Sequence, residues 1–208
     1  MDKKIFERIT KHLLEDEKPS KYMNEISKDA IFNEYPLELL KKLKSTEQSK
    51  KHHPEGNAWN HTMLVLDEAA KVREESKDPK AFMWAALLHD IGKPGTTRIR
   101  KGGRITSYDH DKVGADLCVE FLSYFTEDEE FMEQVRVLVR YHMHMLYVLK
   151  DLPYGDNENM IRKADIHELA LLCKCDRLGR TGADEEAEER EYQQFIKELK
   201  KMKENILV

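Results

Sequence analysis

Histidine and aspartate side chains that could bind a metal ion are spread along the chain in separate segments. They are His61, His89, Asp90, His110, His142 and Asp176. Imidazole nitrogen and carboxylate oxygen atoms are ligands of divalent transition metals, and ligands from several helices can converge inside a helical bundle. A hydrogen-bonded core histidine is an equal alternative for His61 taken alone. The ordered set as a whole indicates a metal site.

The adjacent pair His89-Asp90 poses a physical problem. It directly follows the apolar run from Ala85 to Leu88, where a helix face is expected to be buried. Charged groups are seldom buried without a partner. Either the pair caps a helix end, or a positive charge lies beside it.

Composition and charge exclude several classes of protein. The 208 residues suffice for one large domain or two small ones, with a core large enough to fold without stabilising disulfides or metal ions. The formal net charge is only -5, from 35 Lys and Arg against 40 Asp and Glu, so no general DNA-binding surface is expected. The three cysteines, Cys118, Cys173 and Cys175, are too few for a disulfide framework and predict reduced thiols. No apolar stretch has the length of a signal peptide or a membrane span, which predicts a soluble, cytoplasmic protein without a membrane partner.

Apolar residues recur at helical spacing along nearly the whole chain, which predicts an all-α fold in one domain. The expected parts are three short helices within 1–49, a core over 50–182 and a C-terminal helix over 183–208. Within the core we expect helices over 59–75, from 79 to the His-Asp pair, over 111–125 and over 127–149, the last beginning in a capping box of Thr126 and Glu129. Gly102-Gly103, between two short runs of Arg, Ile and Thr, favours a small β-hairpin near residues 97–107.

Five ordered blocks then carry a resemblance to a known family. They are HHPEGNAWNHTMLVLDEA (52–69), ALLHDIGKPGTTR (86–98), GRITSYDHDKVGA (103–115), VRYHM (139–143) and CDRLGR (175–180). Together they resemble the HD-domain metal-dependent phosphohydrolases, in the form whose signature reads His-Asp-Ile-Gly. The resemblance is nearest to the HD domain of bacterial CCA-adding tRNA nucleotidyltransferases and covers about residues 50–182.

The resemblance implies a helical bundle with a metal centre holding one or two divalent ions, with Mn, Fe, Ni, Co and Zn as candidates. His61, His89, Asp90 and Asp176 would hold a first metal, and Asp90 would bridge to a second held by His110 and His142. A cation beside Asp90 would explain its place behind an apolar face.

One ligand position has two candidates, because His142 and His144 lie about 200° apart around a helix and only one can point inward. We choose His142, where the family-like block reads Arg-Tyr-His, and expect His144 to be solvated. The loop residues His52 and His53, together with His12 and His167, are expected at the surface or packed within loops.

Positive side chains near these ligands could bind a phosphate ester. Lys93, just after the His-Asp pair, is placed to stabilise charge on phosphoryl oxygens or to help the leaving oxygen depart. Lys93 and Asp90 are therefore the two candidates for catalytic residues. The alternative for Lys93 is a helix C-terminal lysine that interacts with the helix dipole. Arg98, Arg177 and Arg180 are candidates for substrate phosphate, with Arg180 favoured and a surface ion pair the alternative for each.

The function implied by the family is a metal-dependent phosphohydrolase with a metal-activated water as nucleophile. Its substrate would be the phosphate ester of a small nucleotide or of an RNA end, in a phosphomonoesterase, nucleotidase or 2',3'-cyclic phosphodiesterase reaction. Asp109-His110-Asp111 departs from the usual Gly-His-Glu, which leaves the local turn open. The first 50 residues contain no glycine and no Gly-Ser followed by paired aspartates. We therefore expect a stand-alone HD module that does not add CCA. The alternatives are a diiron oxygenase of the same superfamily and a non-catalytic module that binds metal and nucleotide.

Overall fold

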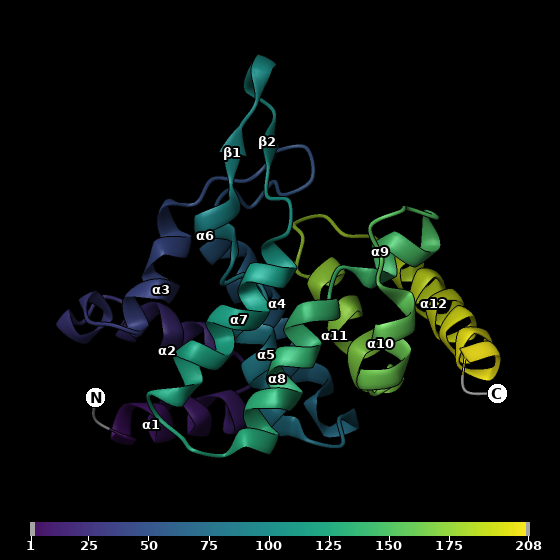
Figure 1. Ribbon diagram of the computed structural model, residues 1–208. Helices are drawn as coiled ribbons and strands as arrows, with labels where there is room; N and C mark the ends of the chain where they lie inside the picture. Colours follow the sequence, from purple (N-terminus) through teal and green to yellow (C-terminus); the bar gives the residue numbers. More distant parts are fainter. Residues whose placement is uncertain (1–2, 207–208) are drawn as a thin grey trace.

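The computed structural model describes residues 3–206, which form a bundle of α-helices with one short hairpin (Figure 1). The N-terminal half contains α1 (Lys3–Glu15), α2 (Pro19–Ile26), α3 (Leu37–Lys41), α4 (Ala58–Val72), α5 (Pro79–Leu88) and α6 (Lys93–Thr96), with 3₁₀ turns at Ala30–Asn33, Lys42–Ser45 and Arg73–Glu75. The C-terminal half contains α7 (His110–Ser123), α8 (Glu129–Tyr141), α9 (His144–Leu149), α10 (Asn157–Lys163), α11 (Ile166–Leu178) and α12 (Glu185–Ile206). The all-α prediction is confirmed. The last two residues of the predicted C-terminal helix and the first two of the N-terminal segment lie outside the described residues.

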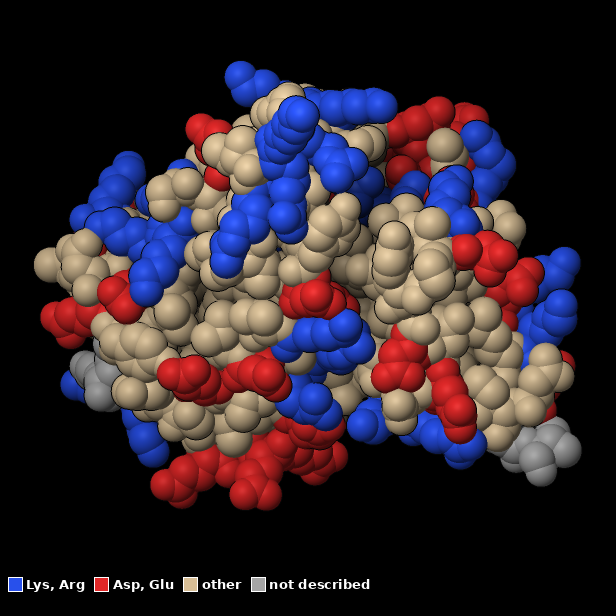
Figure 2. All heavy atoms as spheres, turned by 45° about the horizontal axis from the view of Figure 1, so that its top comes forward, with Lys and Arg blue, Asp and Glu red and all other residues tan. Residues whose placement is uncertain are grey.

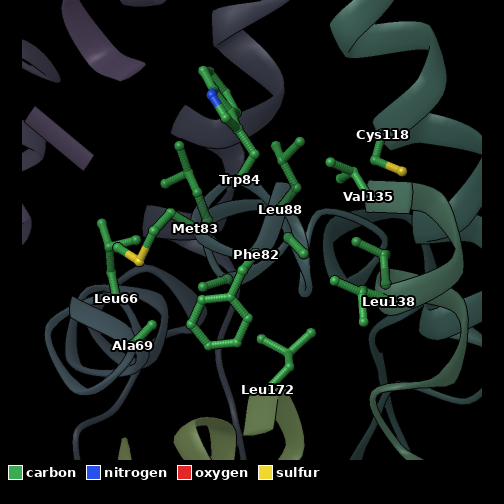
Figure 3. Packing of buried hydrophobic residues seen from close by; sticks show 14 of the residues in the cluster. Leu66, Ala69, Phe82, Met83, Trp84, Leu88, Cys118, Val135, Leu138 and Leu172 are labelled. Carbon is green, nitrogen blue, oxygen red and sulfur yellow. The ribbon is translucent and has the colours of Figure 1, made fainter. Parts of the chain in front are cut away.

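The central helix of the bundle is α5. The Asp78 side chain caps its start by accepting a hydrogen bond from the Ala81 amide at 3.0 Å, and Pro79 occupies its first turn. Every residue from Ala81 to Leu88 is buried, as expected for a helix that is apolar on all sides. Figure 3 shows its side chains between those of α4, α8 and α11. Because α5 ends at Leu88, the His89-Asp90 pair lies in the middle of the molecule.

One apolar interior connects the two ends of the chain. Ile5 and Ile9 of α1 belong to the same buried cluster as Phe195 and Leu199 of α12. The boundaries at residues 49 and 182 stay a sequence prediction. Within residues 3–206, no helix is both long enough and apolar enough to cross a bilayer.

The predicted helix over 127–149 is wrong in one respect, because the chain breaks after Tyr141. α8 ends there, His142 is its C-terminal cap, and α9 starts at His144. The apolar spacing continues through the break, so periodicity alone could not locate it.

The predicted capping box at the start of this segment is also wrong. The Asp128 side chain caps α8 by accepting from the Phe131 amide at 3.1 Å, while the Thr126 hydroxyl oxygen accepts from the Asp128 amide at 3.1 Å. Asp is at least as good a cap as Thr, and Asp128 lies two positions closer to the first residue of α8, Glu129.

The predicted hairpin is confirmed. β1 (Arg98–Ile99) and β2 (Ile105–Thr106) pair antiparallel, with Arg98 opposite Thr106. A turn at Lys101–Gly103, where Gly102 and Gly103 have positive φ angles, connects them. The hairpin extends away from the helices at the top of Figure 1.

Gly92, two residues after Asp90, lies where the chain passes closest to α7. A Cβ atom there would be 2.2 Å from the His110 carbonyl oxygen and 2.6 Å from the Gly114 amide nitrogen. Its backbone angles suit any residue, so the requirement for glycine is one of space.

We expect Gly92→Ala to lower the free energy of unfolding by about 1–3 kcal/mol, because the backbone of α7 must move to make room. Gly95→Ala is the matched control three residues away, since nothing lies within 4 Å of its added Cβ. That change should stay within about 0.5 kcal/mol of the parent in urea denaturation. Equal stabilities of the two variants would contradict the close approach.

Candidate metal centre

Six buried side chains from five parts of the chain converge at one place. His61 comes from α4, His89 and Asp90 from the turn after α5, His110 from the start of α7, His142 from the end of α8, and Asp176 from α11. None of the six is more than 6% exposed. The structure therefore brings together all the metal ligands suggested by the sequence.

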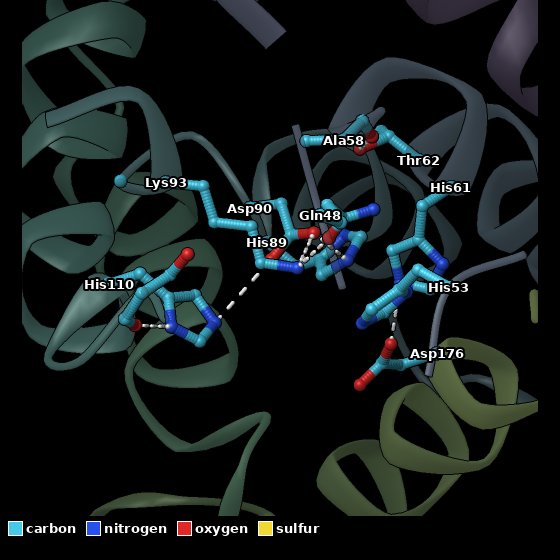
Figure 4. Close-up of polar contacts among 12 residues, drawn as sticks. Gln48, His53, Ala58, His61, Thr62, His89, Asp90, Lys93, His110 and Asp176 are labelled. Atoms are coloured by element: carbon cyan, nitrogen blue, oxygen red, sulfur yellow. Dashed lines mark hydrogen bonds and ion pairs between the residues drawn. The ribbon is translucent and has the colours of Figure 1, made fainter. Parts of the chain in front are cut away.

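Asp90 lies at the centre of this cluster (Figure 4). Its Oδ1 atom is 3.5 Å from His110 Nε2 and 3.9 Å from His142 Nε2, and its Oδ2 atom is 3.3 Å from His89 Nε2. Three groups have donor atoms within 4.8 Å of one another: His53, Glu55 and His61; His61, His89 and Asp90; and Asp90, His110 and His142. Asp90 belongs to the last two, which are fully buried, as a bridging carboxylate would.

Three imidazole rings are held in the same way. In His89, His110 and His142, Nδ1 lies 2.7–2.8 Å from the backbone carbonyl oxygen three residues earlier. A carbonyl can only accept, so Nδ1 carries the proton and Nε2 of the neutral ring has a free lone pair. This is how the rings of metal-binding histidines are usually fixed.

The resulting lone pairs fit a cation. The Nε2 atoms of His110 and His142 approach each other to 3.1 Å, although neither has a proton to donate in this tautomer. His89 Nε2 is buried without a hydrogen-bond partner among residues 3–206. A cation bound by these atoms would satisfy all three rings, so the donor set suits a divalent transition metal.

Burial and charge set the protonation of the cluster. Burial, followed by the charge of His142, lowers the pKa of His110 to about 3, and burial with the charge of His89 lowers the pKa of His142. Burial opposes ionisation of Asp90, but interactions with the His89 ring and with the Lys93 ammonium outweigh it and hold the pKa of Asp90 well below its usual value. Neutral His110 and His142 beside the Asp90 carboxylate are the forms that bind a metal. His61 differs, because burial disfavours its charged form but the contacts with Asp176 and Glu55 outweigh burial and raise its pKa.

A second carboxylate on the far side of His61 was missed by the sequence analysis. Glu55 Oε1 lies 3.0 Å from His61 Nδ1 and 2.9 Å from His53 Nδ1, while Asp176 Oδ1 lies 2.8 Å from His61 Nε2. Glu55 Oε2 also accepts from the Thr181 amide at 3.2 Å. With its side chain only 3% exposed, Glu55 fixes the His61 ring so that Nε2 faces Asp176. The available signal was its position in the His-Pro-Glu-Gly block ahead of His61.

We expect Glu55→Gln to weaken Mn²⁺ binding about 10- to 100-fold, because the amide no longer holds the His61 ring as a charged acceptor. Calorimetric titration of the metal-free protein measures this. Glu47→Gln is the control, an exposed glutamate in the same loop region. If the Glu55 variant kept its Mn²⁺ affinity and showed only a lower melting temperature, Glu55 would stabilise the loop without contributing to metal binding.

Lys93 lies directly beside Asp90. Its ammonium is 2.7 Å from Asp90 Oδ2 and 2.5 Å from the side-chain oxygen of Gln48, another residue the sequence analysis missed. Lys93 is 7% exposed and begins α6, whereas α5 already ends at Leu88. The structure therefore contradicts the alternative of a lysine at the C-terminal end of a helix.

The three candidate arginines lie in different surroundings. Arg180 is at the edge of the cluster, 4.0 Å from Asp176 Oδ2, and its buried Nε atom has no hydrogen-bond partner among residues 3–206. Arg98 is exposed on β1 and donates to the Thr97 carbonyl oxygen at 2.8 Å. Arg177 is paired with Glu188 and Glu191 of α12, so its surface ion-pair alternative is the correct one.

His144 corrects one prediction, because it is fully buried rather than solvated. The break before α9 turns it away from the cluster, and its Nε2 accepts from the Asp156 amide at 3.0 Å. His53 is partly buried against the His61 ring, and His12 stacks on Tyr22. His142 remains the histidine of this segment that faces Asp90.

Comparison with known proteins identifies a family that this chain matches over the region containing the cluster. The sequence model of the HD domain family matches residues 58–181. The chain is 29% identical over 154 residues to a multifunctional CCA protein of Actinobacillus pleuropneumoniae serotype 5b (strain L20), a match that covers 71% of this chain and 36% of that protein. It is 27% identical over 187 residues to a multifunctional CCA protein of Pseudomonas fluorescens (strain SBW25), covering 86% and 43%.

A further relative has a more specific name. The chain is 31% identical over 145 residues to a CC-adding tRNA nucleotidyltransferase of Thermus thermophilus, covering 68% of this chain and 32% of that protein. The chain thus spans less than half the length of the curated relatives it matches. The family match covers more than half of the chain and includes all six clustered residues. This chain belongs to the HD domain family, whose members form a superfamily of metal-dependent phosphohydrolases.

Proposed function

We propose that this protein is a metal-dependent phosphohydrolase that cleaves nucleotide phosphate esters, as a phosphomonoesterase, nucleotidase or 2',3'-cyclic phosphodiesterase. The observation that carries the proposal is the position of Asp90, buried between two groups of histidines and 2.7 Å from the Lys93 ammonium. His61, His89, Asp90 and Asp176 would hold one metal, and Asp90, His110 and His142 a second.

Positive groups beside the cluster support a phosphate as the reacting group. Lys93 and Arg180 both approach a carboxylate of the cluster, and Arg180 Nε lacks a partner among the described residues. An anionic phosphoryl group would bind both side chains, whereas a neutral substrate would leave them facing only carboxylates. The names of the relatives, which include a tRNA nucleotidyltransferase, support a nucleotide or an RNA end as the rest of the substrate.

The roles of the chain's own residues follow from this placement. A divalent metal supplies Lewis acidity toward the phosphate and toward water. Lys93 binds a phosphoryl oxygen and stabilises the charge that grows on it, or assists the leaving oxygen. Arg180 binds the substrate phosphate at the edge of the cluster, and Arg98 contacts the substrate from the hairpin. The Nδ1 contacts of His89, His110 and His142 keep their rings in place.

Metal content and turnover, measured on the same sample, test this function. Protein purified without chelator is analysed for metals and assayed with 2',3'-cAMP and nucleoside monophosphates, each with Mn²⁺, Co²⁺, Ni²⁺, Mg²⁺ and Fe²⁺. Bound metal together with hydrolysis of at least one ester is the expected result. Bound metal with every ester untouched would overturn the proposal and favour the oxygenase or the binding module.

A further inference from the structure

The hairpin carries a concentration of positive charge that the net charge of the chain conceals. Residues 93–108 include five Lys or Arg and no Asp or Glu. Four of the five, Arg98, Arg100, Lys101 and Arg104, are exposed. Within residues 3–206, none of these four forms an ion pair with a carboxylate.

What distinguishes the hairpin is that its unpaired cations are close together, with no Asp or Glu anywhere in residues 93–108. Exposed cations elsewhere include paired ones, as Lys71 is with Glu68, Arg162 with Glu158 and Lys112 with Asp109, and unpaired ones among the described residues, such as Lys197 of α12, which has Glu198 as its neighbour in the sequence. Figure 2 shows blue side chains gathered over the upper part of the molecule, where the hairpin comes forward. Unpaired like charges repel one another, so a cluster of them on a protrusion is best accommodated by an anionic partner.

Both strands of the hairpin connect directly to residues of the candidate metal centre. Its first strand follows α6, which begins with Lys93, and its second strand leads to His110 at the start of α7. The Ser107 carbonyl oxygen, at the hairpin base, accepts from His110 Nδ1. Four residues of extended chain, from Thr97 to Arg100, reach roughly 13 Å from this base. That length corresponds to about four stacked nucleotides at a rise of ~3.4 Å.

An exposed aromatic residue lies at the same base. Tyr108 is 58% exposed, and the Arg100 guanidinium lies 5.9 Å from the centre of its ring. Aromatic rings beside cations bind nucleic acid strands by stacking on bases and by neutralising phosphates. The loop that holds Gln48 against Lys93 adds exposed Lys50 and Lys51.

We propose that the hairpin binds the backbone of a single-stranded nucleic acid whose terminal phosphate ester lies at the metal centre. The inference rests on the proposed function and makes it more specific. The preferred substrate is then the end of an oligonucleotide, and a mononucleotide lacks the phosphates that the hairpin contacts. Arg100, Lys101 and Arg104 contribute to binding of the strand and leave the chemistry of the terminal phosphate to the cluster.

The test compares two variants with equal loss of charge. One carries Arg100→Gln, Lys101→Gln and Arg104→Gln, and the other carries Lys197→Gln, Lys200→Gln and Lys201→Gln on the exposed side of α12. Fluorescence anisotropy measures binding of a short 5'-labelled RNA that carries a 3'-phosphate, and of a DNA with the same sequence. Binding to vesicles that contain phosphatidylserine is measured for comparison. The same samples are assayed for hydrolysis of the oligonucleotide and of 2',3'-cAMP.

The hairpin variant should bind RNA and DNA at least about 10-fold more weakly than the parent. Loss of three phosphate contacts should also flatten the dependence of log affinity on log salt by about 2, since each contact to a single strand contributes ~0.7. Hydrolysis of 2',3'-cAMP should stay within twofold of the parent, and the α12 variant should match the parent throughout.

Equal oligonucleotide affinity in the parent and the hairpin variant would overturn the inference. So would equal weakening by the α12 variant, or binding to vesicles without binding to oligonucleotides. Because anisotropy requires no turnover, it separates the two proposals. Hairpin-dependent binding with no hydrolysis of any ester would refute the proposed function alone, and hydrolysis without hairpin-dependent binding would refute this inference alone.

Discussion

Asp90→Asn should lose metal binding and phosphohydrolase activity together while keeping its helical fold. Within the described chain, Asp90 is the residue common to the group of His61, His89 and Asp90 and the group of Asp90, His110 and His142. Even residues that only orient a ligand cost 10- to 100-fold in metal affinity or activity, so loss of the bridging charge should cost more than about 100-fold in each. The fold should persist because α5 is held by its buried apolar side chains.

Thermal unfolding with and without metal provides a readout that does not depend on activity. Mn²⁺ at about 100 times its dissociation constant should stabilise the parent by about 2.7 kcal/mol, which raises its melting temperature by roughly 5–10 °C. The Asp90→Asn variant should show no such rise. Asp67→Asn is the control, because this half-buried carboxylate of α4 bonds to Ser20 and takes no part in the cluster. A normal metal-induced rise in the Asp90 variant would remove Asp90 from the metal centre.

Much of the fold could be predicted because its signals are local. Asp78 and Pro79 mark the start of α5, and the apolar run to Leu88 identifies a helix that is buried on every side. The hairpin followed from Gly102-Gly103, since the turn requires positive φ angles at both positions. In each case the residues that determine the structure are neighbours in the sequence.

The features that were missed depend on partners distant in the sequence. The break after Tyr141 buries His144 against the Asp156 amide, which periodicity along α8 cannot reveal. Glu55 acquires its role from His61 and Thr181, and the latter lies 126 residues away. Arg177 is neutralised by glutamates of α12, whereas Arg180, three positions later, is not. Tertiary packing decides which polar group meets which, and spacing in the sequence carries little of that information.

The three histidines with the same Nδ1 contact show how local structure fixes the site. His89 and His142 are the C-terminal caps of α5 and α8, where the carbonyl three residues earlier is free to accept. A single hydrogen bond at each helix end thus satisfies a free carbonyl oxygen of the last turn and fixes the orientation of the histidine ring. The end of α5 could be predicted from the sequence and the end of α8 could not, but both ends orient a histidine ring toward Asp90.

Lys93→Met should lower kcat for phosphate esters about 10²- to 10³-fold while leaving metal binding intact. The ammonium 2.7 Å from Asp90 Oδ2 is placed to stabilise charge that develops on the phosphoryl group. It also competes with a metal for the Asp90 carboxylate, so its removal should not weaken Mn²⁺ binding. Methionine keeps most of the side-chain volume. The variant thus separates two roles in one cluster, since Asp90→Asn loses metal and activity whereas Lys93→Met loses activity alone.

The chain offers a matched control for this change. Lys112 also pairs with an aspartate three residues earlier, with its ammonium 2.7 Å from Asp109 Oδ1, but its side chain is 55% exposed. Lys112→Met should leave kcat within twofold, because an exposed pair contributes little and faces no ligand. Steady-state kinetics and metal titration on both variants make the comparison. If Lys93→Met kept its activity within a few-fold, the buried lysine would only neutralise Asp90 in the metal-free protein. If it lost metal as well, its effect on turnover would have to pass through the ligands, and the phosphate would need another cation, for which Arg180 is the nearest candidate beside Asp176.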